Sequence, residues 1–231
     1  MTAQSSPPAG ITALPQLPAA AELSGRIADG VRQLVEEAIL AGTLEAGAHL
    51  NAGALAKQIG VSHIPVREAL RSLAADGWIE HRPHLGAYVR PRSEHELADL
   101  FELRVSVEST SARLAAERRT AAQLAALVAV VDAQEVATAA VDLARINAEF
   151  HVEVAACTQN QWVSTVVTAI SQRARFYFAA VAPRRRGESI REHRLIIDAL
   201  TRRDGERAAA LMEGHITDTW RDAAEQLRHS V

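Results

Sequence analysis

Little in this chain points to a secreted, membrane-spanning or sheet-rich protein. Its single cysteine, Cys157, excludes an intramolecular disulfide, and we expect a buried, inert thiol in a cytoplasmic protein. Aromatic residues make up only 4% of the chain, which favours helices over sheets. No apolar run reaches the roughly 18 residues of a membrane helix, and no signal-peptide layout opens the chain. We therefore expect no contact with a membrane.

An overall excess of basic residues, frequent in nucleic-acid-binding proteins, is also missing. The formal net charge is −3 and the sequence pI is about 6.3. Any contact with DNA must therefore come from a local patch. Residues 57–92 contain six Lys or Arg and three Asp or Glu, a net charge of +3, so positive charge is concentrated there.

The length of 231 residues suits one large or two small domains. Residues 1–22 combine half of the chain's eight prolines with Ser, Thr and Ala, and we expect a disordered tail there. Pro91 closes a first domain of residues 23–91, and residues 92–231 form a second. A helical period over residues 24–41 predicts the first helix, which Gly42 ends.

The stretch LAKQIGVSHIPVREALRSL, residues 55–73, predicts two short helices joined by a tight turn. Gly60 can end the first helix without steric strain, and the Ser62 hydroxyl is suited to accept a backbone N–H at the start of the second. In the second helix Val66 and Leu73 belong to the buried face, whereas Arg67 and Arg71 lie on a polar face. This arrangement suits a helix-turn-helix that enters the DNA major groove, although an ordinary pair of surface helices fits the pattern equally well.

A short hairpin, or wing, is expected after the turn at Asp76-Gly77. Residues 78–80 and 87–89 are expected to form its two strands, with residues 82–86 at the tip. Gly86 would let the backbone approach the minor groove closely.

The rest of the chain predicts helices alone. S-x-x-E at Ser93–Glu96 and the matching Thr120–Gln123 pair predict capping boxes that open helices to about Arg118 and Val136. Further helices are expected over residues 139–157, 161–181, 188–202 and 204–228, and we interpret Arg184, Arg185 and Arg186 as part of a solvated loop. The predicted fold class is mainly α, with an N-terminal winged helix-turn-helix and a C-terminal antiparallel six-helix bundle.

Several motifs resemble one family of bacterial transcription regulators. SHIPVREALRSLAADGWIE and GWIEHRPHLGAYVRP resemble the winged-helix signature of the GntR family. FELRVSVES, NAEFH and IREHRLIIDALTRRDGERAAALMEGHI resemble the FCD ligand-binding domain of its FadR-type branch, and six helices indicate the VanR-like subgroup. His63 and Ile64 stand where the family usually has Arg and Thr, which implies an atypical base preference and a weaker grip on phosphate. The candidate DNA contacts are Lys57, Ser62, His63, Ile64, Pro65, Arg67, Arg71, Arg82, His84 and Gly86.

The resemblance also implies a metal site in the bundle. Asn147 and His151 share one helix face, but spacing alone cannot bring His193 and His215 to them from two other helices. The ligands implied by the resemblance are Asn147, His151, His193 and His215, and imidazole donors suit Zn²⁺ or Ni²⁺. Many relatives have Asp in place of Asn147. The amide lowers metal affinity but leaves a full +2 charge, which favours an anionic effector.

Two arginines are candidates for binding that effector. Arg104 resembles a family position that points into the pocket, where it could pair with a carboxylate in bidentate fashion. An i,i+4 pair between Arg104 and Glu108 on a solvated face fits the sequence equally well. Arg175 is the second candidate, and Arg173 is a weaker one.

These observations favour a metal- and small-carboxylate-responsive transcription regulator, a repressor that binds a palindromic operator of double-stranded DNA as a homodimer. We expect no enzymatic activity. The alternative is a metal-dependent hydrolase that uses the Asn/His₃ site, but H-E-x-x-H is absent, and Glu149 and Glu153 flank His151 on other helix faces. A third possibility is a metal-free scaffold that serves only to dimerise.

Overall fold

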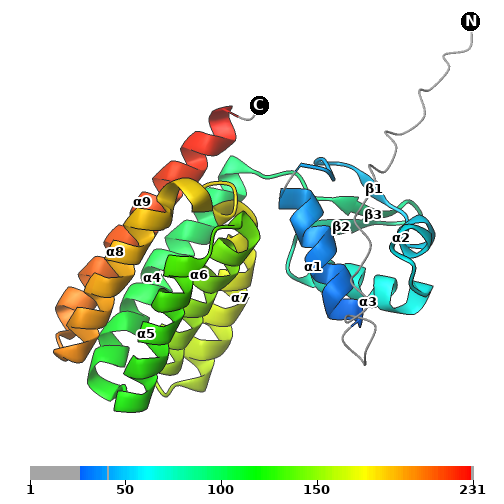
Figure 1. Cartoon of the computed structure of the whole chain (residues 1–231). Coiled ribbons are helices and arrows are strands. Elements are labelled where there is room, and N and C mark those ends of the chain that lie inside the picture. Colours follow the sequence, from blue (N-terminus) through cyan, green and yellow to red (C-terminus); the bar gives the residue numbers. More distant parts are fainter. Residues whose placement is uncertain (1–26, 41, 230–231) are drawn as a thin grey trace, which may run out of the picture. The chain divides into compact units, whose positions relative to one another are not determined.

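The computed structural model describes residues 27–40 and 42–229. The predicted tail and the first residues of the predicted first helix lie outside this range. The described chain divides into two compact units between Pro91 and Arg92, and each is described here by itself (Figure 1).

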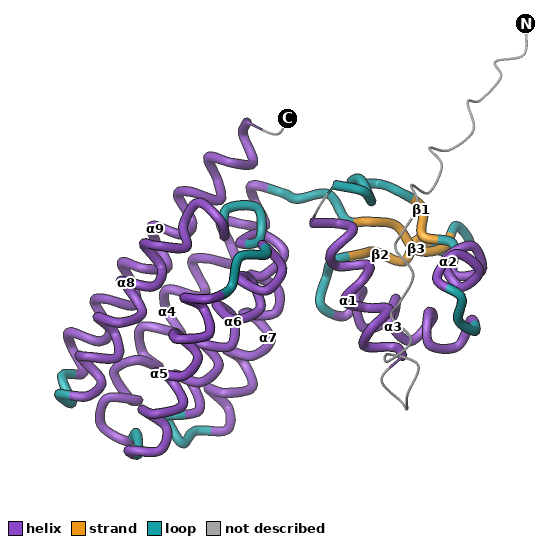
Figure 2. Tube along the Cα trace, in the orientation of Figure 1, coloured by secondary structure: helices purple, strands orange, loops and turns teal. Residues whose placement is uncertain are grey.

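The first unit combines helices with a small antiparallel sheet. Its elements, in chain order, are α1 (Ile27–Leu40), β1 (His49–Leu50), α2 (Ala52–Ile59), α3 (His63–Ala75), β2 (Ile79–Arg82) and β3 (Gly86–Val89). The sheet order is β1-β3-β2, with His49 opposite Tyr88 and Ile79 opposite Val89 (Figure 2). The wing is the β2–β3 hairpin. Strand β1 was not predicted, because two residues are too few to show an alternating pattern.

The turn between α2 and α3 follows from its residues. Gly60 has φ 83°, in the left-handed region, and its N–H donates to the carbonyl of Ala56, which ends α2. Ser62 is the N-cap residue of α3, as predicted, but its hydroxyl accepts no capping hydrogen bond. That detail of the prediction is wrong, and the hydroxyl is exposed at the start of α3.

Helix α3 is anchored by its apolar face. Its buried residues are Val66, Ala69, Leu70 and Leu73, and the helix packs against α1. Burying a valine or leucine side chain stabilises a fold by about 1.5–3 kcal/mol. The spacing of these residues fixes the rotation of the helix, so Arg67 and Arg71 are exposed on the other side.

The second unit is an antiparallel bundle of helices (Figure 1). Its elements are α4 (Glu94–Arg118), α5 (Ala121–Val136), α6 (Ala140–Ala156), α7 (Gln161–Phe178), α8 (Ala182–Thr201) and α9 (Gly205–His229). Helix α4 packs along α9 and also contacts α6, α7 and α8. Among the described residues, no helix is both long and apolar enough to cross a membrane.

The helix starts in this unit differ in part from the prediction. Thr120 and Gln123 form the complete capping box that their spacing predicts. The Ser93 hydroxyl accepts from the Glu96 N–H, but the Glu96 carboxylate accepts from Tyr177 and Arg173 instead of closing the box. That box is therefore only half formed, because charged and phenolic donors of α7 hold the carboxylate.

The basic segment at residues 184–186 was also predicted wrongly. Helix α8 begins at Ala182, with Pro183 in its first turn, where a missing N–H removes no helical hydrogen bond. All three arginines are therefore helical. Arg185 is buried, and its Nη1 atom lies 2.6 Å from Asp222 Oδ2 of α9. Arg184 is exposed, and Arg186 is half-buried.

Candidate DNA-binding face and histidine centre

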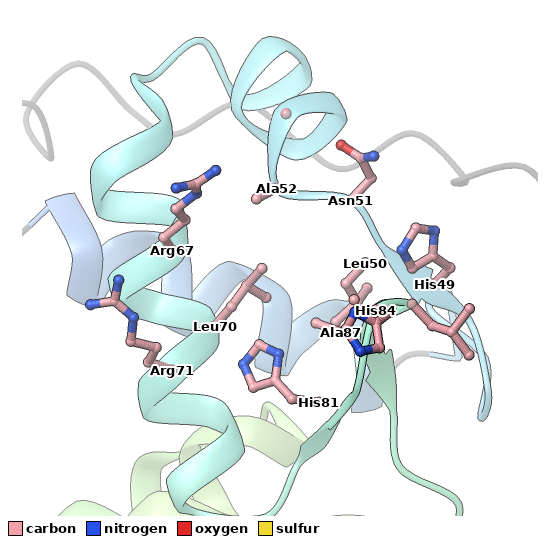
Figure 3. A pocket seen from close by; sticks show the side chains of 13 residues that line it. His49, Leu50, Asn51, Ala52, Arg67, Leu70, Arg71, His81, His84 and Ala87 are labelled. Carbon is pink, nitrogen blue, oxygen red and sulfur yellow. The ribbon is translucent and has the colours of Figure 1, made fainter.

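A hollow of about 750 Å³, lined by both polar and apolar side chains, lies between α3 and the wing in the first unit. Figure 3 shows Arg67 and Arg71 extending from α3, with His81 and His84 of the wing region across from them. Asn51, at the start of α2, and His49 of β1 complete the polar part of its lining. Guanidinium and imidazole groups around a hollow next to an exposed helix face can bind phosphate and base edges.

The predicted DNA contacts fall on three elements around this hollow. Lys57 is exposed in the last turn of α2. Ser62, His63 and Ile64 are exposed at the start of α3, where Pro65 is half-buried. Ile64 leaves 69% of its surface accessible, so an apolar side chain stands where the family usually has a hydroxyl group. The His63 imidazole packs toward Gly53 of α2, so its ring also joins the two helices.

The wing is held together by stacked side chains. The guanidinium carbon of Arg82 lies 4.3 Å from the centre of the Tyr88 ring, and the His49 ring lies 4.9 Å from that centre. Arg82 also forms an ion pair with Glu80 at 2.7 Å. Part of its charge is thus already offset within the wing, which leaves Arg67 and Arg71 as the stronger candidates for phosphate or base contacts.

Gly86 is required for this arrangement. Its φ of 104° lies in the left-handed region, and a Cβ there would meet His49 Nε2 at 2.8 Å. His49 therefore packs directly on the backbone of the wing. Gly86 is exposed beside His84, as its predicted place at the tip requires.

The second unit brings three distant histidines together in its interior. His151 of α6, His193 of α8 and His215 of α9 form the histidine triad. His215 Nε2 lies 3.2 Å from His151 Nε2 and 3.4 Å from His193 Nε2. All three residues are at most 2% exposed. The fold thus joins the three residues that sequence spacing alone could not.

Each imidazole of the triad has an oxygen acceptor behind it. His151 Nδ1 lies 2.5 Å from Glu108 Oε2, His193 Nδ1 lies 2.9 Å from Gln134 Oε1, and His215 Nδ1 lies 2.6 Å from Glu192 Oε2. The acceptors come from α4, α5 and α8, respectively. For His193 and His215 this acceptor forms a hydrogen bond that places the proton on Nδ1 and leaves the Nε2 lone pair to point at the other rings, whereas His151 and Glu108 form a close ion-pair contact.

The protonation states agree with this arrangement. Burial alone would raise the pKa of Glu108, but Arg104 and His151 outweigh it and lower the pKa to about 2. Burial lowers the pKa of His151 to about 4, and it also lowers the pKa of His193 and His215. The lowered pKa values favour ionised carboxylates and neutral imidazoles, whose Nε2 atoms converge. Such a cluster is complementary to a cation.

Of the other predicted pocket residues, Asn147 and Arg104 lie next to the triad. Asn147, one turn before His151, is buried, and its Oδ1 atom has no hydrogen-bond partner among the described residues. Arg104 does form the i,i+4 pair with Glu108, at 2.6 Å, but the pair is buried instead of solvated. Arg175 of α7 is buried and donates to Gln172, whereas Arg173 binds Glu96 at the start of α4.

Three residues of this centre, Glu108, Gln134 and Glu192, were not among the predicted site residues. Glu192 had a local signal, since it precedes His193, and Glu108 had one through its spacing from Arg104. Gln134 had none, because its contact with His193 joins residues 59 positions apart. Cys157 is buried, as expected, and burial raises the pKa of its thiol to about 11.

Each of the two units matches a known protein family. Residues 27–89 match the family model described as "Bacterial regulatory proteins, gntR family", and residues 99–218 match the FCD domain. The chain is 30% identical over 187 residues to the Nta operon transcriptional regulator of Aminobacter aminovorans, covering 80% of this chain and 89% of that protein. The chain belongs to the GntR family. Its FCD domain fits the FadR-type branch, as the resemblance implied.

Two further comparisons extend this result. Over 90 residues, the GntR-family chain is 40% identical to a probable D-xylose utilization operon transcriptional repressor of Paenarthrobacter nicotinovorans, covering 39% of this chain and 40% of that one. A putative transcriptional regulator GntR of Rhodococcus sp. RHA1 has the same fold, with a TM-score of 0.68 and 22% identity, covering 89% of this chain and 99% of that one. The protein is a DNA-binding transcriptional regulator of the GntR/FCD type, and such regulators are not enzymes.

Proposed function

We propose that this regulator holds a divalent metal ion at Asn147 and the histidine triad and responds to a small carboxylate that binds beside it. In this proposal it represses transcription as a homodimer on a palindromic operator. The observation that carries the proposal is the convergence of three buried Nε2 atoms, each on a ring whose Nδ1 atom lies 2.5–2.9 Å from a side-chain oxygen. Without a cation, this arrangement would be electrostatically unfavourable.

The spacing of the triad fits a metal ion. Zinc–imidazole bonds of about 2.0–2.1 Å in tetrahedral geometry place donor atoms about 3.3–3.4 Å apart. The two short Nε2–Nε2 distances are 3.2 and 3.4 Å. The unpartnered Asn147 Oδ1 supplies a neutral oxygen donor one turn away on α6. Zn²⁺ and Ni²⁺ both suit such a set, and either would polarise an anion bound at a remaining coordination position.

Polar groups for a carboxylate lie on one side of the triad. Helices α4, α6 and α8 run in the same direction (Figure 1). Arg104, Asn147 and Ser189 each precede a residue of the centre by one turn, so they lie on the same side of it. The Ser189 hydroxyl is buried without a hydrogen-bond partner among the described residues. A buried hydroxyl and a buried guanidinium favour an anionic ligand with several acceptor oxygens.

The DNA side of the proposal rests on α3 and the hollow beside it. A dimer would present two copies of Arg67 and Arg71 to half-sites about 10 base pairs apart, or a multiple of that spacing. Carboxylate binding would change operator affinity only if the ligand binds the two arrangements of the dimer with different affinity. The similarity to a protein named as a probable repressor supports repression over activation.

The hydrolase alternative gains no support from the site. Both carboxylates that contact the triad, Glu108 and Glu192, are also engaged by Arg104 and Arg185. Each is thus held as an ionised acceptor by two partners, which opposes a role as a general base. Of the two carboxylates considered from sequence, Glu149 is exposed on α6 and Glu153 is half-buried.

Binding to the regulator's own upstream DNA tests the proposal. We expect sequence-specific binding in fluorescence anisotropy that weakens as salt is raised, because phosphate contacts release counterions. Arg67→Ala should weaken it by roughly 1–3 kcal/mol if the contact is a bidentate base contact. Arg145→Ala, which removes an exposed arginine of α6, is the matched control and should change nothing.

The proposed response to metal and carboxylate is tested in the same assay. A panel of small organic acids should release the operator from zinc-loaded protein and leave chelator-treated protein unaffected. Salt-insensitive binding, or an Arg67→Ala variant that binds like the wild type, would show that α3 does not read the operator. Release that persists after removal of the metal would contradict the proposed metal-dependent site.

A further inference from the structure

The three acceptors behind the histidine triad are not equivalent. Glu108 accepts from Arg104 at 2.6 Å, and Glu192 accepts from Arg185 at 2.7 Å, so arginines hold both carboxylates in place. Gln134, behind His193, is a neutral amide on α5 and is fully buried. Its Nε2 atom has no hydrogen-bond partner among the described residues. The third acceptor is therefore the weakest of the three and is not held by a charged partner.

His193 depends on this amide more than its neighbours depend on their carboxylates. Its other close partner outside the triad is the Phe150 ring, stacked at 3.8 Å with an interplanar angle of 16°. Stacking fixes the plane of the imidazole, but a half-turn about the Cβ–Cγ bond keeps that plane and exchanges the two edges of the ring. The hydrogen bond from Nδ1 to Gln134 Oε1 at 2.9 Å is the directional contact that distinguishes the two orientations.

The orientation of the amide also sets the position of the imidazole proton. With Oε1 facing Nδ1, the proton lies on Nδ1, and the Nε2 lone pair points toward His215. With the amide reversed, its NH₂ group would face Nδ1, and the proton would move to Nε2, into the centre. A protonated Nε2 cannot bind a metal ion.

We propose that Gln134 is the positioning residue for His193, and that its side-chain carbonyl makes this imidazole a metal ligand. The inference rests on the metal site proposed above. A neutral acceptor raises the basicity of an imidazole less than a carboxylate does, so Gln134 also keeps metal affinity below the value that a glutamate would give. The centre then combines two strongly polarised ligands with one weakly polarised ligand.

Zinc affinity of the full-length protein tests this role. Chelator-treated protein is titrated with Zn²⁺ against a chromophoric chelator, and the absorption spectrum of the Co²⁺ form is recorded. Gln134→Leu removes the acceptor at nearly constant volume and should weaken zinc binding by roughly 10–100-fold, the usual effect of losing such a partner. Gln134→Glu retains an acceptor and should bind zinc at least as tightly as the wild type.

Thermal melting of the metal-free forms separates positioning from packing. Gln134→Leu removes a buried amide whose N–H groups are unpaired and also leaves His193 Nδ1 without its acceptor, two opposite effects of similar size, so the metal-free variant should melt close to the wild type. Gln123→Leu on the same helix removes the capping box of α5 and should lower the melting temperature without changing zinc affinity or the Co²⁺ spectrum.

The outcomes distinguish the positioning role from the metal site itself. Unchanged zinc affinity and an unchanged Co²⁺ spectrum in Gln134→Leu would overturn the role of Gln134 and leave the metal site standing. A wild-type protein that takes up no metal would overturn both. If Gln134→Leu does not fold, Gln134→Glu decides alone, since weaker zinc binding by that variant would contradict the proposal.

Discussion

At the scale of single residues, Asn147 would determine how much charge the proposed metal centre carries. The carboxylate of an Asp there would offset half of the charge of a divalent ion. The amide offsets none, so the proposed centre keeps a charge of +2 to attract an anion. Asn147 Oδ1 is buried and has no hydrogen-bond partner among the described residues, which is costly unless a metal ion or a ligand satisfies it.

Asn147→Asp should therefore raise the affinity of the protein for the metal ion and lower its affinity for the effector. We expect zinc to bind roughly tenfold more tightly or better, which corresponds to at least about 1.4 kcal/mol. The carboxylate effector should bind more weakly, because the charge of the bound ion is then partly neutralised. Isothermal titration with each ligand measures both effects. Asn160→Asp, at the half-buried N-cap of α7, adds the same charge elsewhere and should leave both affinities unchanged.

A variant that gained zinc affinity without losing carboxylate affinity would show that the anion does not bind next to the ion. One that changed neither affinity would remove Asn147 from the ligand set. The histidine triad would then have to bind metal with solvent or effector as its fourth partner.

At the scale of secondary-structure elements, helix starts and ends that depend on neighbouring residues were predicted correctly. Those that depend on contacts between distant residues were not. Gly60 and the Thr120–Gln123 box act within one turn, and the structure follows both. The Ser93–Glu96 box half failed because Tyr177 and Arg173, about 80 positions away, hold the Glu96 carboxylate. The start of α8 was misplaced because Pro183 ends helices in some settings and begins them in others. Sequence alone could not predict Gln134, whose only signal is a partner on another helix.

The first turn of α4 is tied to the last turns of α7. Arg92 Nε donates to the Phe176 carbonyl at 2.9 Å, and the Tyr177 hydroxyl donates to Glu96 at 2.9 Å. Arg173 Nε also donates to Glu96, at 3.0 Å. These contacts fix the residues that follow Pro91, where the chain enters the bundle, to a helix whose C-terminal half is buried. Motion of α7 would therefore move the start of α4.

Tyr177→Phe should weaken this connection without touching the histidine triad. We expect the bundle to lose about 0.5–1.5 kcal/mol of unfolding free energy, the usual effect of one lost hydrogen bond. Carboxylate affinity should be unchanged, but saturating carboxylate should change operator affinity by a smaller factor than in the wild type. Tyr88→Phe removes the hydroxyl of the other tyrosine, in the wing, and should leave the bundle's stability unchanged. Full retention of the carboxylate effect would exclude this route of coupling.

At the scale of the whole chain, sequence pattern and resemblance were enough to predict the fold class and the family. The chemistry of the second unit could not be predicted in this way, because it depends on side chains that meet from five different helices. Neutral histidines at its centre make the stability of the protein depend on pH. Burial lowers the pKa of His151 to about 4, and lowers the pKa of His193 and His215, from an unfolded value near 6.5. Between these values the unfolded chain binds more protons than the folded chain. Stability is then fully present above pH 6.5 and is lost as the pH falls toward 4.

Metal-free protein should show this loss in urea unfolding followed by circular dichroism at a series of pH values. Each unit of lowered pKa corresponds to about 1.4 kcal/mol, so the unfolding free energy should fall steeply over this window. Glu108, with its pKa lowered to about 2, adds a further loss only below pH 4.5.

His193→Gln should flatten the profile between pH 6.5 and 4, whereas His95→Gln, an exposed histidine of α4, should not. Zinc should stabilise the wild type most at high pH, because protons compete for the same nitrogens. A flat profile in metal-free wild type would mean that the three imidazoles are not held neutral in the interior.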